Sequence, residues 1–239
     1  MRRTHAAALA CAAPRSAILV IVSMLALAAT LLLFGTTHAD LLVQDRLFDP
    51  VAGAWIWSKQ EPVLRALLYD APRVAIILIG VGCAIAFLAS FRMRHLAACR
   101  RELIVVALSL ALVPGTVGAL KAMTNVACPT QLDRYGGQVP TLMLFDHYKA
   151  DQLPDRRQHC FPAEHAAGGF ALLSLLLFVG QGPRKLIAAV ALLALGMAMA
   201  GYKMAIGDHF LSHGLVSLAI AVLVIAGLDL VTKAVWRAH

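Results

Sequence analysis

Two histidines lie four residues apart in a short polar break between two long apolar runs. His209 and His213 belong to the stretch from Lys203 to His213, which also contains Asp208. Ionisable groups at a membrane boundary are costly to dehydrate and therefore tend to mark functional sites. A helix that begins near Asp208 would place both imidazoles on one face, because residues at i and i+4 are neighbours. We expect Asp208 to cap that helix and the two histidines to form the centre of a functional site.

Two upstream stretches contain further groups of the same kind. The first runs from Lys121 to Pro129, and the second is Pro162-Ala163-Glu164-His165. Lysines supply positive charge for an anion such as phosphate. One histidine can attack phosphorus as a nucleophile, a second can protonate the leaving oxygen, and a third group can orient the nucleophile. Together the three stretches predict phosphoryl transfer on a substrate that resides in a membrane.

The composition is that of an integral membrane protein. Hydrophobic residues make up 60% of the 239 residues and charged residues only 14%, whereas soluble domains are roughly half apolar and a quarter charged. A helix needs about 20 apolar residues to cross a hydrocarbon core of roughly 30 Å. Runs near this length occur at 16–36, 73–91, 103–121, 166–182, 186–206 and 211–230. The sequence therefore predicts an all-α, six-helix bundle that forms a single membrane domain over residues 1–239.

The net charge of +8 does not indicate a nucleic-acid partner, because the basic residues follow the expected topology. In a six-span arrangement, short segments on one side carry most of them, as the positive-inside rule expects. These are Arg2, Arg3, Arg15, Arg92, Arg94, Arg100, Arg101, Arg184, Lys185, Lys233 and Arg237. We therefore expect both termini, including residues 1–15, in the cytoplasm of a bacterium, with the chain in the inner membrane. The candidate site then faces the exterior, together with the loops at 37–72 and 122–165.

These two loops carry separate expectations. Residues 40–72 are expected to form one or two short helices at the membrane interface, or an ordinary loop with anchoring tryptophans. The loop at 122–165 contains two of the five cysteines, Cys128 and Cys160. In an oxidising compartment these two cysteines could form a disulfide bond; two free thiols are the alternative.

The three stretches resemble the signature motifs of the type 2 phosphatidic acid phosphatase family. The first family motif is a lysine, six residues and Arg-Pro, and here Lys121 is followed by six residues and Cys128-Pro129. The second is Pro-Ser-Gly-His, and here it is Pro162-Ala163-Glu164-His165. Both motifs keep the order, the spacing and the position at helix ends that the family shows.

The third family motif is Ser-Arg, five residues, His, three residues and Asp. Here Tyr202-Lys203 is followed by five residues, His209, three residues and His213. The resemblance covers about residues 103–229. It implies that His209 forms a phosphohistidine, that His165 assists the leaving group, and that Lys121 and Lys203 bind phosphate. It also implies no cofactor and no metal requirement, and a lipid phosphate or diphosphate as substrate.

Several positions depart from the family pattern. Cys128 replaces an arginine that binds phosphate, Glu164 replaces a glycine, and His213 replaces the aspartate that orients the nucleophile. Glu164 is a candidate to supply the missing carboxylate through a hydrogen bond to His213 or His209. Arg134, Arg156 or Arg157 is a candidate to replace the lost arginine in binding phosphate.

Other functions remain open at this point. His209 and His213, with Glu164 and His165 nearby, could ligate zinc. The protein could also be a lipid phosphotransferase, or a non-catalytic lipid-binding or transport protein on the same scaffold. The lipid itself is open among phosphatidate, phosphatidylglycerol phosphate, polyprenyl diphosphate and lipid A.

Overall fold

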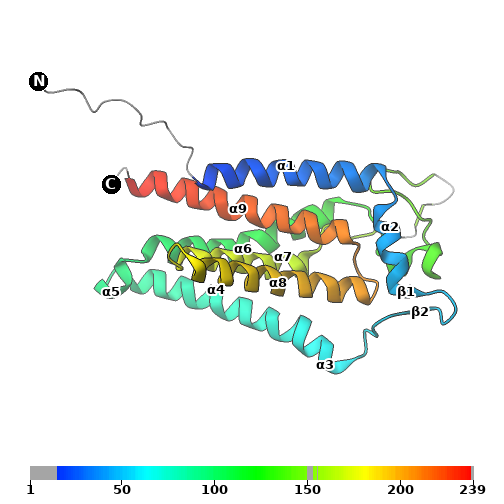
Figure 1. Cartoon of the computed structure of the whole chain (residues 1–239), viewed down its shortest axis with the longest axis horizontal. Coiled ribbons are helices and arrows are strands. Elements are labelled where there is room, and N and C mark those ends of the chain that lie inside the picture. Colours follow the sequence, from blue (N-terminus) through cyan, green and yellow to red (C-terminus); the bar gives the residue numbers. More distant parts are fainter. Residues whose placement is uncertain (1–14, 150–152, 155, 238–239) are drawn as a thin grey trace, which may run out of the picture.

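The protein is a bundle of long helices that run roughly side by side (Figure 1). The computed structural model describes residues 15–149, 153–154 and 156–237. The predicted cytoplasmic segment 1–15 therefore lies almost entirely outside the described residues.

In the part of the chain that the structure describes, five helices are long and apolar enough to cross a membrane. They are α1 (Arg15–Thr36), the continuous helix Pro62–Ala89, α6 (Arg100–Met123), α8 (Pro183–Ala205) and α9 (Leu211–Arg237). Their outward faces are strongly apolar: Leu25, Leu78 and Ile187 are 65%, 65% and 68% exposed. Extended exposed apolar surface of this kind is typical of contact with a bilayer. The chain is a membrane protein.

The fourth predicted span is shorter than expected. The run at 166–182 forms α7 (Glu164–Ala171) and the 3-10 helix η6 (Leu172–Leu177). At about 1.5 Å per residue in α7 and about 2.0 Å in η6, this segment extends only about 24 Å, less than the thickness of a hydrocarbon core. Most of α7 is buried, and it packs against α6, α8 and α9. Among the described residues the structure therefore gives five helices of spanning length and one shorter central helix, so the predicted count of six spans is not confirmed.

Small residues let α7 and α8 approach closely. A side chain at Gly169 would meet the sulfur of Met199 at 2.6 Å and the backbone of Gly196 at 3.1 Å. A side chain at Gly196 would overlap the ring of Phe170. Such small-residue contacts are common where membrane helices pack, and here they hold α7 in the centre of the bundle.

The segment between the first two long helices is more ordered than the sequence predicted. It contains α2 (Ala39–Gln44), the 3-10 turn η1 (Asp45–Leu47), and a short antiparallel hairpin of β1 (Phe48–Asp49) and β2 (Ala54–Trp55). The Trp55 ring packs on Phe48 and Tyr135 at centroid distances of 5.0 Å and 5.1 Å. The hairpin thereby contacts the long loop that follows α6.

The second long helix begins eleven residues earlier than predicted, at Pro62 instead of Arg73. Its parts are α3 (Pro62–Arg65), a π-helical turn η2 (Ala66–Asp70) and α4 (Ala71–Ala89). The Glu61 side chain accepts hydrogen bonds from the N–H groups of Val63 and Leu64 and so caps the new start. The predicted start at Arg73 therefore lies inside a continuing helix, directly after Pro72.

At the end of the bundle where α1 begins, a buried carboxylate joins three helices. Asp229 of α9 binds Arg101 of α6 at 2.5 Å and Lys233 at 2.6 Å, and it accepts a hydrogen bond from Ser16 of α1. Asp229 is only 5% exposed. The cluster fixes this end of the bundle, opposite the site described next.

The other helical elements of the described residues are short. They are α5 (Arg94–Ala97), η3 (Pro129–Gln131) and η4 (Asp133–Tyr135). The first lies in the basic turn between α4 and α6, and the other two lie in the loop after α6.

Candidate functional site

The three predicted stretches lie at helix ends on the same side of the bundle (Figure 1). Lys121 is near the end of α6, His165 is the second residue of α7, and Lys203 is near the end of α8. His209 lies in the connection from α8 to α9, and His213 lies in the first turn of α9. Positive charge on Lys121, Lys203 and His165 lowers the pKa of His209, so these side chains are close enough to His209 to interact with it electrostatically.

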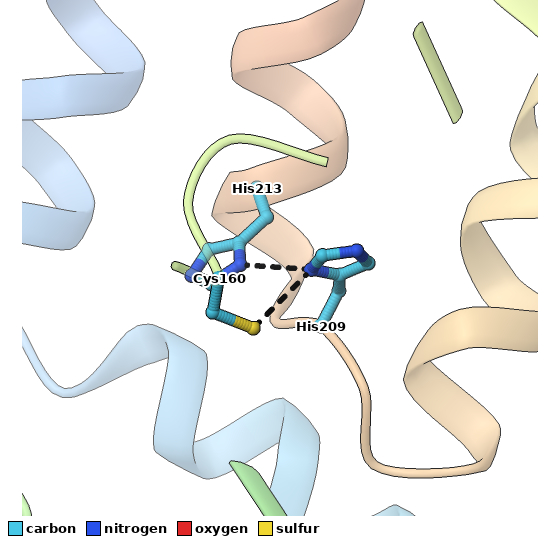
Figure 2. A group of neighbouring side chains, drawn as sticks. All are labelled: Cys160, His209 and His213. Atoms are coloured by element: carbon cyan, nitrogen blue, oxygen red, sulfur yellow. Dashed lines mark hydrogen bonds between the residues drawn. The ribbon is translucent and has the colours of Figure 1, made fainter. Parts of the chain in front are cut away.

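His209 is held through its Nδ1 atom. This nitrogen lies 3.3 Å from Nδ1 of His213 and 3.5 Å from the sulfur of Cys160, as Figure 2 shows. The Cys160 sulfur belongs to a disulfide bond and carries no hydrogen, so it can only accept. We therefore assign the proton of His209 to Nδ1, with Nδ1 of His213 as acceptor. This tautomer leaves a lone pair on Nε2 of His209.

The start of α9 differs from the predicted one. The helix begins at Leu211, so His209 precedes it. Asp208 does not cap the helix; the cap comes from Asp40 of α2, whose carboxylate accepts from the N–H and the hydroxyl of Ser212. A residue distant in sequence therefore fixes the turn that carries His209.

Burial keeps His209 neutral. Desolvation, followed by the positive charges of Lys121 and Lys203, lowers the pKa of His209 to about 3. Removal from water disfavours the charged imidazolium, and nearby cations add to that effect. At neutral pH His209 is thus an uncharged imidazole, which is the form that can act as a nucleophile.

His165 is held through its other nitrogen. Its Nε2 lies 3.0 Å from the carbonyl oxygen of Leu68, and its ring stacks on Tyr69 at a centroid distance of 4.3 Å. A carbonyl only accepts, so Nε2 carries a proton and Nδ1 is the free nitrogen. Burial is the main reason why the pKa of His165 lies below its usual value. Leu68 and Tyr69 were missed from the sequence, which showed only an aromatic in an apolar stretch.

Each lysine of the site lies next to a carboxylate. Lys121 Nζ is 3.7 Å from the half-exposed Glu164, and Lys203 Nζ is 2.9 Å from Asp208. Lys59 also forms an ion pair with Asp208. A bound phosphate would therefore share these cations with carboxylates that are already present.

Neither hypothesis for replacing the lost family residues matches the observed contacts. Glu164 lies beside Lys121, and among the described residues no hydrogen bond joins it to His209 or His213. Arg134 binds Asp45 with two hydrogen bonds of 2.8 Å and 2.7 Å. Glu164 is therefore in contact with Lys121, and the Arg134 guanidinium is bound to the carboxylate of Asp45.

The other two candidate arginines also lie elsewhere. Arg157 donates to the backbone carbonyls of Met123 and Thr124 at the end of α6, and Arg156 is exposed. The group beside Nδ1 of His209 is His213 and not a carboxylate, and none of the three candidate arginines takes the place of the one that Cys128 replaces.

Cys128 and Cys160 are joined by a disulfide bond. It ties the segment after α6 to the segment before α7, next to the paired residues Val126 and His159. Cys160 is fully buried, and its sulfur contacts His209. The disulfide therefore forms one wall of the site.

The same contact bears on the zinc alternative. The potential ligand atoms of Cys160, His209 and His213 lie within 4.8 Å of one another, without Glu164 or His165. The sulfur is bonded to Cys128, so it is not available as the thiolate through which a cysteine binds zinc. The arrangement with Glu164 and His165 that the sequence suggested is not the one that the structure assembles.

A cavity of about 580 Å³ adjoins His213. Its walls are mainly apolar and include Phe34, Phe161 and Phe210, with His147 from the long loop. Its lining includes none of His209, His165 and the two site lysines. This cavity therefore adjoins His213 and is separate from His209, His165 and the two lysines.

Comparison with known proteins gives one match. A family model described as the PAP2 superfamily matches residues 102–237, which include all three stretches. No curated protein and no solved structure matches the chain.

Proposed function

The chain belongs to the PAP2 superfamily, and from that premise we propose that it is a membrane phosphatase acting on a lipid phosphate or diphosphate. Membership supports phosphatase-type chemistry on phosphate esters. The strongly apolar surface of the bundle supports a substrate that reaches the site from the bilayer. The arrangement of the histidines supports the mechanism that follows.

In the first step, the Nε2 lone pair of His209 attacks phosphorus. A nitrogen–phosphorus bond forms, and the bond from phosphorus to the lipid oxygen breaks. A proton on Nδ1 of His165 passes to the leaving oxygen. Lys121 and Lys203 balance the charge on the phosphoryl oxygens.

In the second step, water replaces the lipid. His165, now neutral, accepts a proton from a water molecule at Nδ1 as the water oxygen bonds to phosphorus. The nitrogen–phosphorus bond breaks, and His209 regains its lone pair. Inorganic phosphate leaves, and both histidines return to their starting protonation states.

The contact between Nδ1 of His209 and Nδ1 of His213 carries this proposal. It orients the nucleophile and fixes its tautomer, the task that an acidic residue performs in the general triad scheme. A neutral imidazole accepts more weakly than a carboxylate, because hydrogen bonds to charged acceptors are roughly twice as strong. We therefore expect phosphoenzyme formation to be slower than it would be with an aspartate at this position.

We further propose that the site faces the exterior of a bacterial inner membrane. The disulfide bond supports an oxidising compartment on that side. The opposite end of the bundle contains the basic turn from Arg92 to Arg101, which supports a cytoplasmic location for that end.

A phosphotransferase is the second candidate. The same phosphohistidine would pass its phosphoryl group to a second lipid instead of water. Both lysines are paired with carboxylates, so part of their positive charge is already balanced, which suits a less highly charged acceptor. Transfer of labelled phosphate to an added lipid would distinguish the two.

The experiment measures inorganic phosphate released from a panel of lipid monophosphates and diphosphates by purified protein, with a chelator present. The matched variant is His209→Gln, which keeps the size and polarity of the side chain. Release that is lost in His209→Gln supports the proposal and identifies the substrate class. Equal release by both proteins would contradict it, and release that depends on metal would favour the zinc alternative.

A further inference from the structure

A π-helical turn outside the family-matched region contributes to the site. Turn η2 (Ala66–Asp70) belongs to the second long helix. It contacts His165 through the carbonyl of Leu68, at 3.0 Å, and through the ring of Tyr69, at a centroid distance of 4.3 Å and an interplanar angle of 26°. Lys203 Nζ lies 4.3 Å from the same ring centroid. One turn therefore reaches a cation and a histidine from two other helices.

The sequence explains why the Leu68 carbonyl is available. In an α-helix this carbonyl would accept from the N–H of the residue four positions later. That residue is Pro72, which has no N–H. The turn is also widened, because the N–H of Ala71 donates to Ala66, five residues back. The freed carbonyl is satisfied by Nε2 of His165, and π-helical turns of this type are frequent at functional sites.

The Tyr69 ring interacts favourably with both neighbours when they are charged. The face of an aromatic ring is negative, so it attracts the Lys203 ammonium and a protonated imidazole. The proposed reaction needs His165 in its protonated form to release the lipid. The ring therefore favours the reactive form of His165 against the effect of burial.

We propose that Tyr69 and the Leu68 carbonyl position His165 and Lys203 for phosphoryl transfer, so that Nδ1 of His165 is presented to the leaving group. This inference rests on the proposed phosphatase function and adds an element from outside the matched family region. Tyr69 is a positioning residue: it acts through His165 and Lys203.

Three variants test the inference. Tyr69→Leu removes the ring, Tyr69→Phe keeps it, and Leu67→Ala is a matched control in the same turn, where the side chain is 62% exposed. From the usual strength of contacts between cations and aromatic rings, we expect Tyr69→Leu to lower kcat by roughly 3- to 30-fold. Tyr69→Phe and Leu67→Ala should remain close to the parent protein.

Two readouts distinguish positioning from general damage. The alkaline limb of the kcat/KM profile should move to lower pH in Tyr69→Leu, since His165 loses its proton more easily without the ring. The same shift should be visible without any substrate, by NMR titration of isotope-labelled histidines with His165 assigned by its Ala variant. The charged or titratable groups that act on His165 are Lys203, Arg73, Asp70 and His209, and none of them changes in these variants.

The outcomes separate this inference from the proposed function. A His165 titration that shifts in Tyr69→Leu but not in Tyr69→Phe supports the positioning role, even if no lipid phosphate is hydrolysed. An unchanged titration in Tyr69→Leu overturns it, even if the protein is an active phosphatase. Equal effects of Leu and Phe would also overturn it, because the hydroxyl and not the ring would then be the important group.

Discussion

Replacing His213 tests the way in which the nucleophile is oriented. His213 is 1% exposed and packs against the rings of Phe161 and Phe210, so a substitution must fill its space. Asn can place an oxygen close to the position of Nδ1 and still accept from His209. Leu has a similar size but no acceptor. The two variants therefore differ mainly in one hydrogen bond.

The expected magnitude follows from that bond. Its loss costs about 0.5–1.5 kcal/mol, and a buried N–H without a good acceptor costs about 1–3 kcal/mol. The Cys160 sulfur, which would still lie beside Nδ1 of His209, is only a weak acceptor. At about 1.4 kcal/mol for each factor of ten in rate, His213→Leu should lower kcat by about 10- to 100-fold. His213→Asn should stay within about threefold of the parent protein.

The assay is phosphate release at saturating substrate, with thermal stability measured on each variant to confirm folding. A parent-like rate in His213→Leu would refute the orienting role. Equal losses in Leu and Asn would show that His213 acts through another property, such as its packing or its Nε2 atom.

Three further predictions concern pH, the disulfide and the opposite end of the bundle. The pKa of His209 is lowered to about 3, so kcat/KM should show no acid limb near pH 6.5. The pKa of His165, which must be protonated, is lowered by burial, so activity should fall as pH rises through a value below 6.5. A kcat/KM profile measured from pH 3.5 to 8 that stays flat up to about pH 8 would contradict this. Reductant should lower the Tm, because opening a disulfide that spans 32 residues costs about 3–4 kcal/mol by loop entropy. The Tm of a Cys128→Ser/Cys160→Ser double variant should not change with reductant. A Tm of the parent protein that is equally unchanged would argue against the bond. Asp229→Asn should lower the free energy of unfolding by about 1–3 kcal/mol, since it weakens the contacts with two cations, and a Tm equal to that of the parent protein would count against the cluster as a stabilising feature.

The long apolar runs predicted most of the helices well. The runs at 103–121 and 186–206 correspond to Arg100–Met123 and Pro183–Ala205. The run at 166–182 forms a helical segment below spanning length, and apolar length alone does not distinguish a membrane helix from a buried core helix. There the small residues of α7 pack inside the bundle, and only the close approach to α8 shows this.

The motifs predicted which histidines and lysines meet, but not the contacts that hold them. Arg134 was interpreted as a phosphate ligand from its charge, whereas its partner Asp45 lies 89 residues away in sequence. Asp208 has the residue type of a helix cap, yet Asp40 takes that role from 172 residues away. The contact between Tyr69 and His165 likewise depends on how two helices pack. No local pattern encodes such partners, because they are fixed by tertiary structure.

The central claim is that His209 becomes covalently phosphorylated. The direct measurement is a rapid base-quenched single turnover with ³²P-labelled lipid phosphate, followed by mass spectrometry of the labelled peptide. The account predicts a label that is stable to base, labile to acid and located on His209, and that is absent in His209→Gln. Turnover of the substrate without a label on His209, or with a label on another residue, would contradict it.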